Sequence, residues 1–230
     1  MKSTLHILLI TLLFHINLSA QNTGESELGS FYEISLSNRI TNKLSISGFF
    51  TNWNYELSTE NPQLILGIVG LNYHINKNVT VGIGYANGVI DTSFEINDVT
   101  NISENRILEQ IVLKHKLNSI GLSHRFKLEQ RFLEFPTENI LKHRIRYRFK
   151  SNISINKTLF VSIYDEIHFN LNEFDFQQNR AYAGLGGNLN KNINVQLGYL
   201  RHSFKTNNFN RISLQLNFNY DFRKEKTTQL

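Results

Sequence analysis

The sequence predicts an all-β protein, a single antiparallel up-and-down transmembrane β-barrel of roughly 10–12 strands, preceded by a cleaved signal peptide. Three observations predict it: apolar and polar residues alternate along the chain, short and longer connections alternate between those segments, and the N-terminus is an apolar leader. The composition agrees. An aromatic content of 12 % with a mean hydropathy of −0.28 fits neither a disordered chain nor a bundle of membrane helices.

The N-terminal segment has the order of a secretory signal peptide. Lys2 supplies a basic start, residues 5–18 form an apolar stretch, and Ser19 and Ala20 end it with small residues. The apolar stretch is shorter than the about 20 residues of a membrane-spanning helix, so a retained anchor is the less favoured alternative. We therefore expect a signal peptide at 1–20, an outer-membrane barrel at 21–222 and a short polar tail at 223–230.

Alternation with a period of two is clearest near the C-terminus. The apolar set on one face is Ile212, Leu214, Leu216, Phe218, Tyr220 and Phe222. The polar set on the other is Arg211, Ser213, Gln215, Asn217, Asn219 and Asp221. A strand separates these two sets onto opposite faces, whereas a helix would scatter them.

Extending this criterion along the chain gives eleven candidate strands and no internal helix. They lie near 29–38, 43–55, 63–75, 78–90, 106–117, 119–133, 140–151, 157–170, 178–190, 193–204 and 209–222. Most reach the about 9–11 residues that a tilted strand needs to span a bilayer, and soluble sandwiches use shorter strands. Because bacterial single-chain barrels have even strand numbers, we expect a missed short strand or an inserted segment within Gln21 to Leu28.

The connections fall into two sets. One is short and rich in Asn and Lys, at 37–39, 75–78, 152–157 and 190–192. Since Asn tolerates left-handed backbone geometry, we expect tight turns there. The other set is longer, at 56–62, 88–105, 134–139, 170–178 and 202–208, and contains both prolines. Short turns alternating with long loops are typical of an outer-membrane barrel, and a secreted soluble barrel or sandwich is the alternative.

Two neighbouring strands in the middle of the chain carry a ladder of charges. Arg125, Lys127, Glu129 and Arg131 share one face of the first strand, and Lys142, Arg144, Arg146 and Arg148 share one face of the second. A hairpin would place Glu129 among Arg144 and Arg146, because cross-strand neighbours lie about 5 Å apart. A lipid-facing ladder is rejected, since each Arg or Lys there costs about 2–4 kcal/mol.

The excess positive charge of this ladder needs partners. Candidates are Glu166 on the next strand, Glu109 on the preceding one, and Asp175 before Arg180. Two interpretations remain open: an ion-pair network that packs a narrow interior, or a basic lumen that holds anions. The predicted interior network comprises Arg125, Lys127, Glu129, Arg131, Arg144, Arg146, Arg148, Glu166 and Arg180.

These segments resemble a known family, the domain of unknown function 2490 group of uncharacterised Bacteroidetes-type outer-membrane barrels. The resemblance is carried by the runs at 124–132, 144–148 and 174–180, by Gly198-Tyr199-Leu200, and more loosely by Gly84-Tyr85-Ala86. Lys127 stands where the family usually has Arg. The resemblance implies an outer-membrane barrel and no established activity.

Sequence motifs for catalysis are weak. Ser123 and His124 are adjacent and point to opposite faces of a strand, although His143 could approach His124 across the hairpin. The chain has no Cys, and of neighbouring candidates only Glu166 and His168 share a face, so we expect neither metal nor cofactor. A net charge of +5 without a basic helix gives no reason to expect nucleic-acid binding.

The favoured function is a non-enzymatic outer-membrane barrel, either structural or a narrow pore with an Arg/Glu-lined interior. Its expected partners are outer-membrane lipid and, as candidates, small anionic solutes. Two alternatives remain: a lipid-active enzyme, and a binding or assembly module that uses the loop at 88–105 with its acids Asp91, Glu95, Asp98 and Glu104.

Overall fold

The computed structural model describes residues 24–96 and 100–223, and all its regular elements are strands. In chain order they are β1 (Leu28–Arg39), β2 (Leu44–Asn54), β3 (Pro62–His74), β4 (Val79–Asp91), β5 (Asn101–Leu117), β6 (Ile120–Glu134), β7 (Asn139–Ser154), β8 (Leu159–Asn170), β9 (Asp175–Asn188), β10 (Ile193–Phe204) and β11 (Asn208–Asp221). Within the described ranges no helix is long and apolar enough to cross a membrane. The predicted signal peptide lies outside the described residues.

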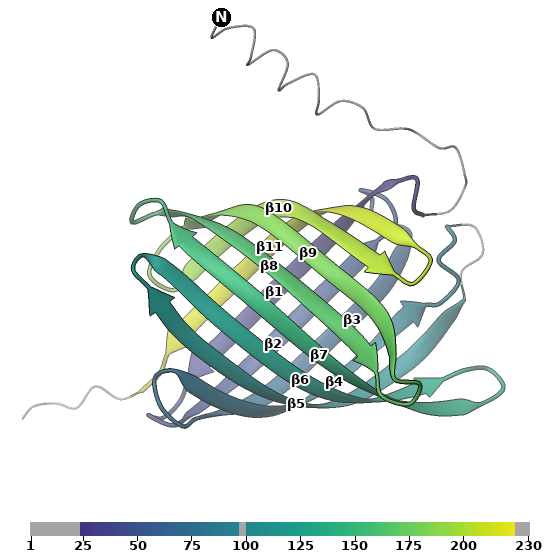
Figure 1. Cartoon of the computed structure of the whole chain (residues 1–230), viewed down its shortest axis with the longest axis horizontal. Coiled ribbons are helices and arrows are strands. Elements are labelled where there is room, and N and C mark those ends of the chain that lie inside the picture. The colour runs from purple at the N-terminus through teal and green to yellow at the C-terminus, as the bar shows by residue number, and fades with distance from the viewer. Residues whose placement is uncertain (1–23, 97–99, 224–230) are drawn as a thin grey trace, which may run out of the picture.

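The strands close into one barrel in which sequence neighbours pair side by side (Figure 1). Every sequential pair is antiparallel, as predicted, and β1 closes the barrel on β11 in parallel, with Ile34 opposite Leu216. Parallel closure follows from the odd strand number, because the first and last strands of an up-and-down series then run the same way. The expected additional strand is absent from residues 24–27, and residues 21–23 lie outside the described ranges.

The barrel has two unlike ends, which we call the turn end and the loop end. At the turn end, on the left of Figure 1, lie the connections 40–43, 75–78, 118–119, 155–158 and 189–192. At the loop end lie the connections 55–61, 135–138, 171–174 and 205–207, together with residues 92–96 and 100 of the connection after β4. The expected long loops are shorter than predicted, because β5 begins at Asn101 instead of 106 and β9 at Asp175 instead of 178.

A repeated side-chain contact builds the turn end. The Oδ1 atom of Asn76 accepts hydrogen bonds from the backbone N–H groups of residues 78 and 79, and Asn156 and Asn190 do the same in their own turns. Thr41 takes this part in the β1–β2 turn. The tight turns are therefore present, but for a different reason than expected. Left-handed backbone geometry occurs at Asn118 alone among these turn residues within the described ranges.

The two faces of the strands differ as a transmembrane barrel requires. Large apolar side chains point outward and are exposed, among them Ile83 at 64 % and Ile145 at 40 %. The neighbouring side chain of Arg146 points into the barrel and is 7 % exposed. Outward aromatic rings stack along β11 and just beyond it, from Phe218 through Tyr220 to Phe222. This is the inverse of a soluble barrel, whose apolar residues fill the interior.

The interior is not uniformly polar. An apolar cluster lies inside the barrel and comprises Phe31, Trp53, Leu64, Leu66, Ala86, Leu108, Tyr164, Tyr182 and Leu200. Most of these residues come from β1 to β5, whereas the charged side chains come mainly from β5 to β9. One side of the inner wall is therefore largely apolar and the other is charged.

Candidate functional site

The charged wall arises from the register of β5, β6, β7 and β8. Glu129 of β6 faces Arg144 of β7, and the next inward pair is Lys127 with Arg146. The third pair is Arg125 with Arg148. On its other side, Arg148 pairs with Glu166 of β8. Alternation turns all these side chains inward, so a sheet with a lipid-facing outer surface concentrates its charges in the lumen.

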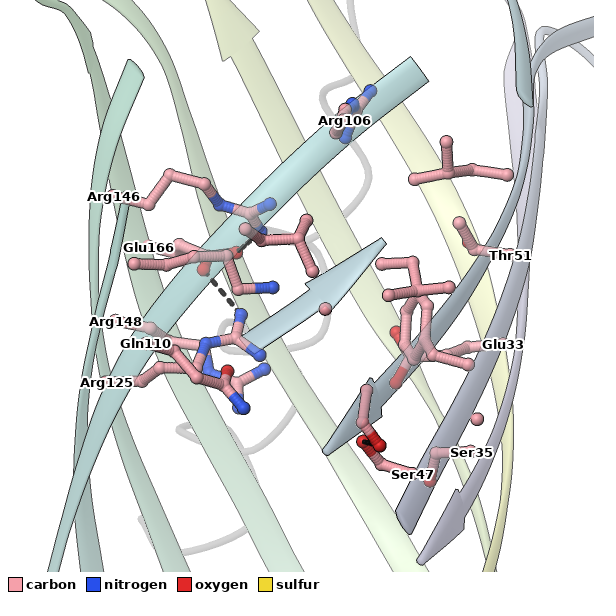
Figure 2. Close-up of a pocket in the computed structure, with 18 of the residues that line it drawn as sticks. Glu33, Ser35, Ser47, Thr51, Arg106, Gln110, Arg125, Arg146, Arg148 and Glu166 are labelled. Atoms are coloured by element: carbon pink, nitrogen blue, oxygen red, sulfur yellow. Dashed lines mark hydrogen bonds and ion pairs between the residues drawn. The ribbon is translucent and has the colours of Figure 1, made fainter. Parts of the chain in front are cut away.

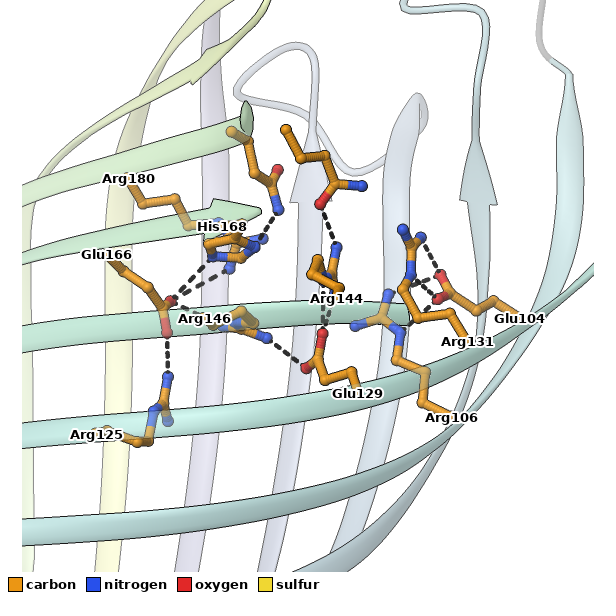
Figure 3. Close-up of polar contacts among 12 residues, drawn as sticks. Glu104, Arg106, Arg125, Glu129, Arg131, Arg144, Arg146, Glu166, His168 and Arg180 are labelled. Atoms are coloured by element: carbon orange, nitrogen blue, oxygen red, sulfur yellow. Dashed lines mark hydrogen bonds and ion pairs between the residues drawn. The ribbon is translucent and has the colours of Figure 1, made fainter. Parts of the chain in front are cut away.

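The carboxylate nearest the loop end belongs to Glu104 of β5. Its side chain is fully buried and receives two arginines, each in a fork geometry (Figure 3). Arg106 donates from Nε and Nη2 at 2.6 and 2.7 Å, and Arg131 donates from the same two atoms at 2.5 and 3.0 Å. Bidentate contacts of this kind fix both guanidinium planes.

Glu129 is the middle carboxylate and is also fully buried. Arg144 donates to its Oε2 atom from Nε at 2.7 Å and from Nη2, and Arg146 donates to its Oε1 atom at 2.7 Å. The remaining contact of Arg144 is with Gln177 Oε1 at 2.9 Å. Glu129 therefore neutralises two guanidiniums, of which Arg144 has no second carboxylate.

Glu166 of β8 completes the series toward the turn end. Its Oε1 atom accepts from Arg125 Nη2 at 2.6 Å, and its Oε2 atom accepts from Arg146 Nη2 at 2.8 Å. Arg146 thus links Glu129 to Glu166 (Figure 3). His168 Nε2 and Arg180 Nη1 lie farther from Oε2, at 3.5 and 3.9 Å.

A second buried network fills the lumen at the loop end. Gln178 joins two histidines. Its Nε2 atom lies 2.7 Å from His168 Nδ1, and its Oε1 atom lies 2.5 Å from His202 Nε2. Arg211, fully buried, lies 3.0 Å from His202 Nδ1 and donates to Gln63 Oε1. The side chains of this network and of the Glu104 cluster are buried, so they pack the lumen at the loop end.

Tyr55 extends this packing outside the strands. Its hydroxyl donates to Asp91 Oδ2 at 2.6 Å, and its ring packs against Phe209. Burial, and then the hydrogen bond to Asp91, raise the pKa of the Tyr55 hydroxyl above its ordinary value. The hydroxyl therefore remains a donor throughout the physiological pH range.

A cavity of about 250 Å³ lies inside the barrel beside the charged wall (Figure 2). Arg125, Arg146 and Arg148 lie on one side of it, and Glu33, Ser35 and Thr51 lie on the opposite side. Trp53 and Arg180 also line it, with the guanidinium 4.1 Å from the indole ring. The cavity thus combines a basic wall with a wall of hydroxyls and one carboxylate.

The family model "Protein of unknown function (DUF2490)" matches residues 28–225, which include every strand of the barrel. The chain belongs to the DUF2490 family. It is an outer-membrane-type β-barrel, and the family description names no activity.

No curated protein matches the chain. A similar solved structure is LpxR from Salmonella typhimurium, with 8 % sequence identity and a TM-score of 0.47, covering 76 % of this chain and 83 % of that one. At this TM-score the likeness supports no conclusion about this chain.

The nine residues of the predicted network all lie on the inward face. Six of them take part in the ion pairs of Glu129 and Glu166, and Arg131 pairs with Glu104 instead. Lys127 and Arg148 form no ion pair among the described residues. Arg148 lies 5.5 Å from the Tyr164 ring.

Two of the proposed carboxylate partners are wrong. Glu109 points outward from β5 between Ile83 and Leu128, so it cannot reach the lumen. Asp175 contacts Lys205 and Asn170 at the barrel rim and does not pair with Arg180. Glu104, which the sequence analysis placed in the loop at 88–105, is instead the inner partner on β5. In the sequence, the spacing of two residues between Glu104 and Arg106 is the pattern that indicates a shared strand face.

The approach of His143 to His124 across the hairpin, which the sequence allowed, does not occur. His143 faces Gln130 in the β6–β7 pairing, and His124 faces Phe149, six residues farther along β7. His124 instead stacks on His115 of β5 and lies 2.9 Å from the Tyr147 hydroxyl. The part of the chain that the structure describes contains no group of three His, Cys, Asp or Glu side chains suited to a metal.

Proposed function

We propose that this chain is an outer-membrane barrel of structural type, closed to solute flow by its own side chains. The outward apolar surface supports a membrane location, since hydrocarbon is the solvent that favours such a surface. Outer-membrane lipid is then the partner of this surface. The short turns face the periplasm, and the loop end faces outward.

Burial at the loop end carries the proposal. Glu104, Glu129, His202 and Arg211 are 0 % exposed, although all four lie on the luminal face. A water-filled channel would leave such side chains hydrated. Ion pairs between close guanidiniums and carboxylates instead bridge β5, β6, β7 and β8 on the luminal side. This favours the structural interpretation over the narrow pore.

Single-channel recording on refolded protein in planar bilayers tests the proposal. Heat-modifiable mobility on gels first verifies that the barrel has folded. We expect no steady conductance from the wild-type protein. A variant with Glu104, Arg106 and Arg131 all changed to Ser removes the whole outermost cluster, leaves no charge of that cluster unpaired, and is expected to raise conductance. Steady channels in the wild-type protein would overturn the proposal.

A further inference from the structure

The basic wall of the cavity holds more cationic groups than its carboxylates neutralise. Six cationic side chains line the cavity: Arg106, Arg125, Lys127, Arg146, Arg148 and Arg180. Its lining carboxylates are Glu33 and Glu166. Glu104 and Glu129, which lie outside the lining, satisfy Arg106 and part of Arg146. Positive charge therefore remains on the turn-end side of the network.

Two cationic side chains account for this remainder. Lys127 is 7 % exposed and lines the cavity, yet its ammonium has no hydrogen bond or ion pair among the described residues. Arg148 also lines the cavity, and its guanidinium contacts the Tyr164 ring instead of a carboxylate. Glu166, its neighbour on β8, is already bound to Arg125 and Arg146. Lys127 is buried and Arg148 is partly buried. An unpaired charge away from water is costly, so these two side chains mark a place where a counter-charge is missing.

The shortage of negative charge is concentrated where β6 pairs with β7. Arg125 and Arg148 lie directly opposite each other as like charges, and the carboxylate beside them, Glu166, pairs with Arg125 but not with Arg148. The Nε atom of Arg125 is buried and has no hydrogen-bond partner. Glu33 lines the opposite side of the cavity and forms no ion pair with any described residue (Figure 2). This carboxylate therefore forms no ion pair with the basic wall.

We propose that this cavity binds a small anion carrying a phosphate or carboxylate group, held by Arg125, Lys127 and Arg148. Arginine holds such groups through paired N–H donors, and lysine adds a point charge. A cavity needs about 10–15 Å³ to admit one water molecule, so about 250 Å³ admits a multi-atom anion. Ser35 and Thr51 line the opposite wall, but their hydroxyls donate to Asn217 Oδ1 and to the backbone carbonyl of Tyr32, so the basic wall alone supplies the donors for the anion.

The anion enters from the turn end. Toward the loop end the lumen is packed by fully buried side chains, including Glu104 and Arg211. Toward the turn end, inward residues such as Ser37 and Ser47 are partly exposed, and Lys114 and Asn152 are exposed. The site is thus a blind chamber, which agrees with the closed barrel proposed above without depending on it.

Titration of the refolded full chain with inorganic phosphate tests the site. Calorimetry at constant ionic strength gives the affinity, and the fluorescence of Trp53, the single tryptophan, reports changes at the cavity wall. We expect saturable binding of one phosphate. Arg148→Gln should weaken it at least about tenfold, because a charge-assisted contact is lost. Because Arg148 has no ion-pair partner among the described residues, its substitution leaves no carboxylate unpaired. Lys127→Met is a second variant with the same property.

Arg201→Gln is the matched control, since this arginine lies on the outward face of β10 and should leave the affinity unchanged. The absence of saturable binding in the wild-type protein, or an unchanged affinity in both wall variants, overturns the site. Competition by phosphatidylglycerol in the micelle indicates a lipid headgroup as the source, and its absence indicates a soluble anion. Conductance tests the closed barrel separately, so failure of either proposal is distinguishable from failure of the other.

Discussion

Each of the three buried carboxylates of the network is shared between arginines, so the loss of one carboxylate affects two cations. A buried ion pair adds little net stability, because both ions lose their hydration on folding. Removal of one partner is different, since the other charge then stays buried without compensation. The network therefore imposes register on β5, β6, β7 and β8 more than it strengthens the fold.

Glu129→Ala tests this at a single residue. Arg144 would keep only Gln177 as a partner, while Arg146 would keep Glu166. We expect a loss of about 3–5 kcal/mol in unfolding free energy, measured by urea titration in detergent with Trp53 fluorescence. Glu95→Ala, an exposed residue near the loop end, is the control and should change little.

A double variant separates lost pairing from lost packing. Glu129→Ala with Arg144→Ala removes the stranded guanidinium as well, so it should be less destabilised than the sum of the two single variants. Equal midpoints for Glu129→Ala and Glu95→Ala would contradict the structural importance of this carboxylate.

The raised pKa of Tyr55 predicts that the stability of the folded protein falls at high pH. Its pKa is raised in the folded protein above the unfolded value of about 10, so the folded state retains the proton more tightly. The stability that this contributes is fully present below pH 10 and is lost as the pH rises toward the folded pKa. We expect the unfolding midpoint of the wild-type protein to fall above pH 10 more steeply than that of Tyr55→Phe. Parallel pH profiles for the two proteins would contradict this.

At the residue scale, the sequence does not show which face of β5 points into the barrel. Glu109 lies among Ile107 and Ile111, and Glu104 precedes Arg106, yet both acids are candidates by charge alone. The inward face of β5 also carries Leu108 and Val112, so its alternation does not mark the polar side. Only pairing with β6 places Glu104 opposite Leu133 and next to Arg131. Charge ladders on β6 and β7 are predictable because both of their faces are unambiguous.

At the scale of elements, the eleven strands follow from alternation, and their ends depend on cross-strand pairing. β5 extends to Asn101 because Asn101 pairs with Asp91 and Ile102 with Ile90, contacts that no local pattern reveals. The inner apolar cluster was missed for a related reason. β3 is apolar on both faces, as Leu64, Ile65 and Leu66 illustrate, and a continuous apolar run does not say which side faces lipid.

The parallel closure is the element-level feature that sequence could not supply, and a disulfide tests it. The chain contains no Cys, so Ile34→Cys with Leu216→Cys introduces a single possible bridge. Adjacent strands lie about 4.8 Å apart, within the range that a disulfide spans. We expect oxidation to cross-link this variant, detected by mobility on non-reducing gels.

Ile34→Cys with Leu185→Cys is the control for the closure. Leu185 also points outward, but it lies on β9, which does not pair with β1. Cross-linking of the control to the same extent, or none in the Ile34 and Leu216 variant, would show that β1 does not close on β11.

The whole molecule combines an odd strand number with two unlike ends. Leu28 begins β1 at the loop end, and Asp221 ends β11 at the turn end, so the barrel wall starts and finishes on opposite sides of the membrane. The packed network lies toward the loop end and the chamber toward the turn end. Orientation in the membrane therefore decides which compartment supplies the anion.

Cysteine labelling in cells tests this orientation. Glu173→Cys places a thiol in the exposed 171–174 loop, and Lys191→Cys places one in an exposed Asn-capped turn. If the turns face the periplasm, a membrane-impermeant maleimide labels Glu173→Cys in intact cells and Lys191→Cys only after the outer membrane is permeabilised. The two variants control for each other, because both thiols are exposed and lie outside the strands. Labelling of Lys191→Cys in intact cells would reverse the orientation and place the mouth of the chamber at the cell surface, where external anions would enter it.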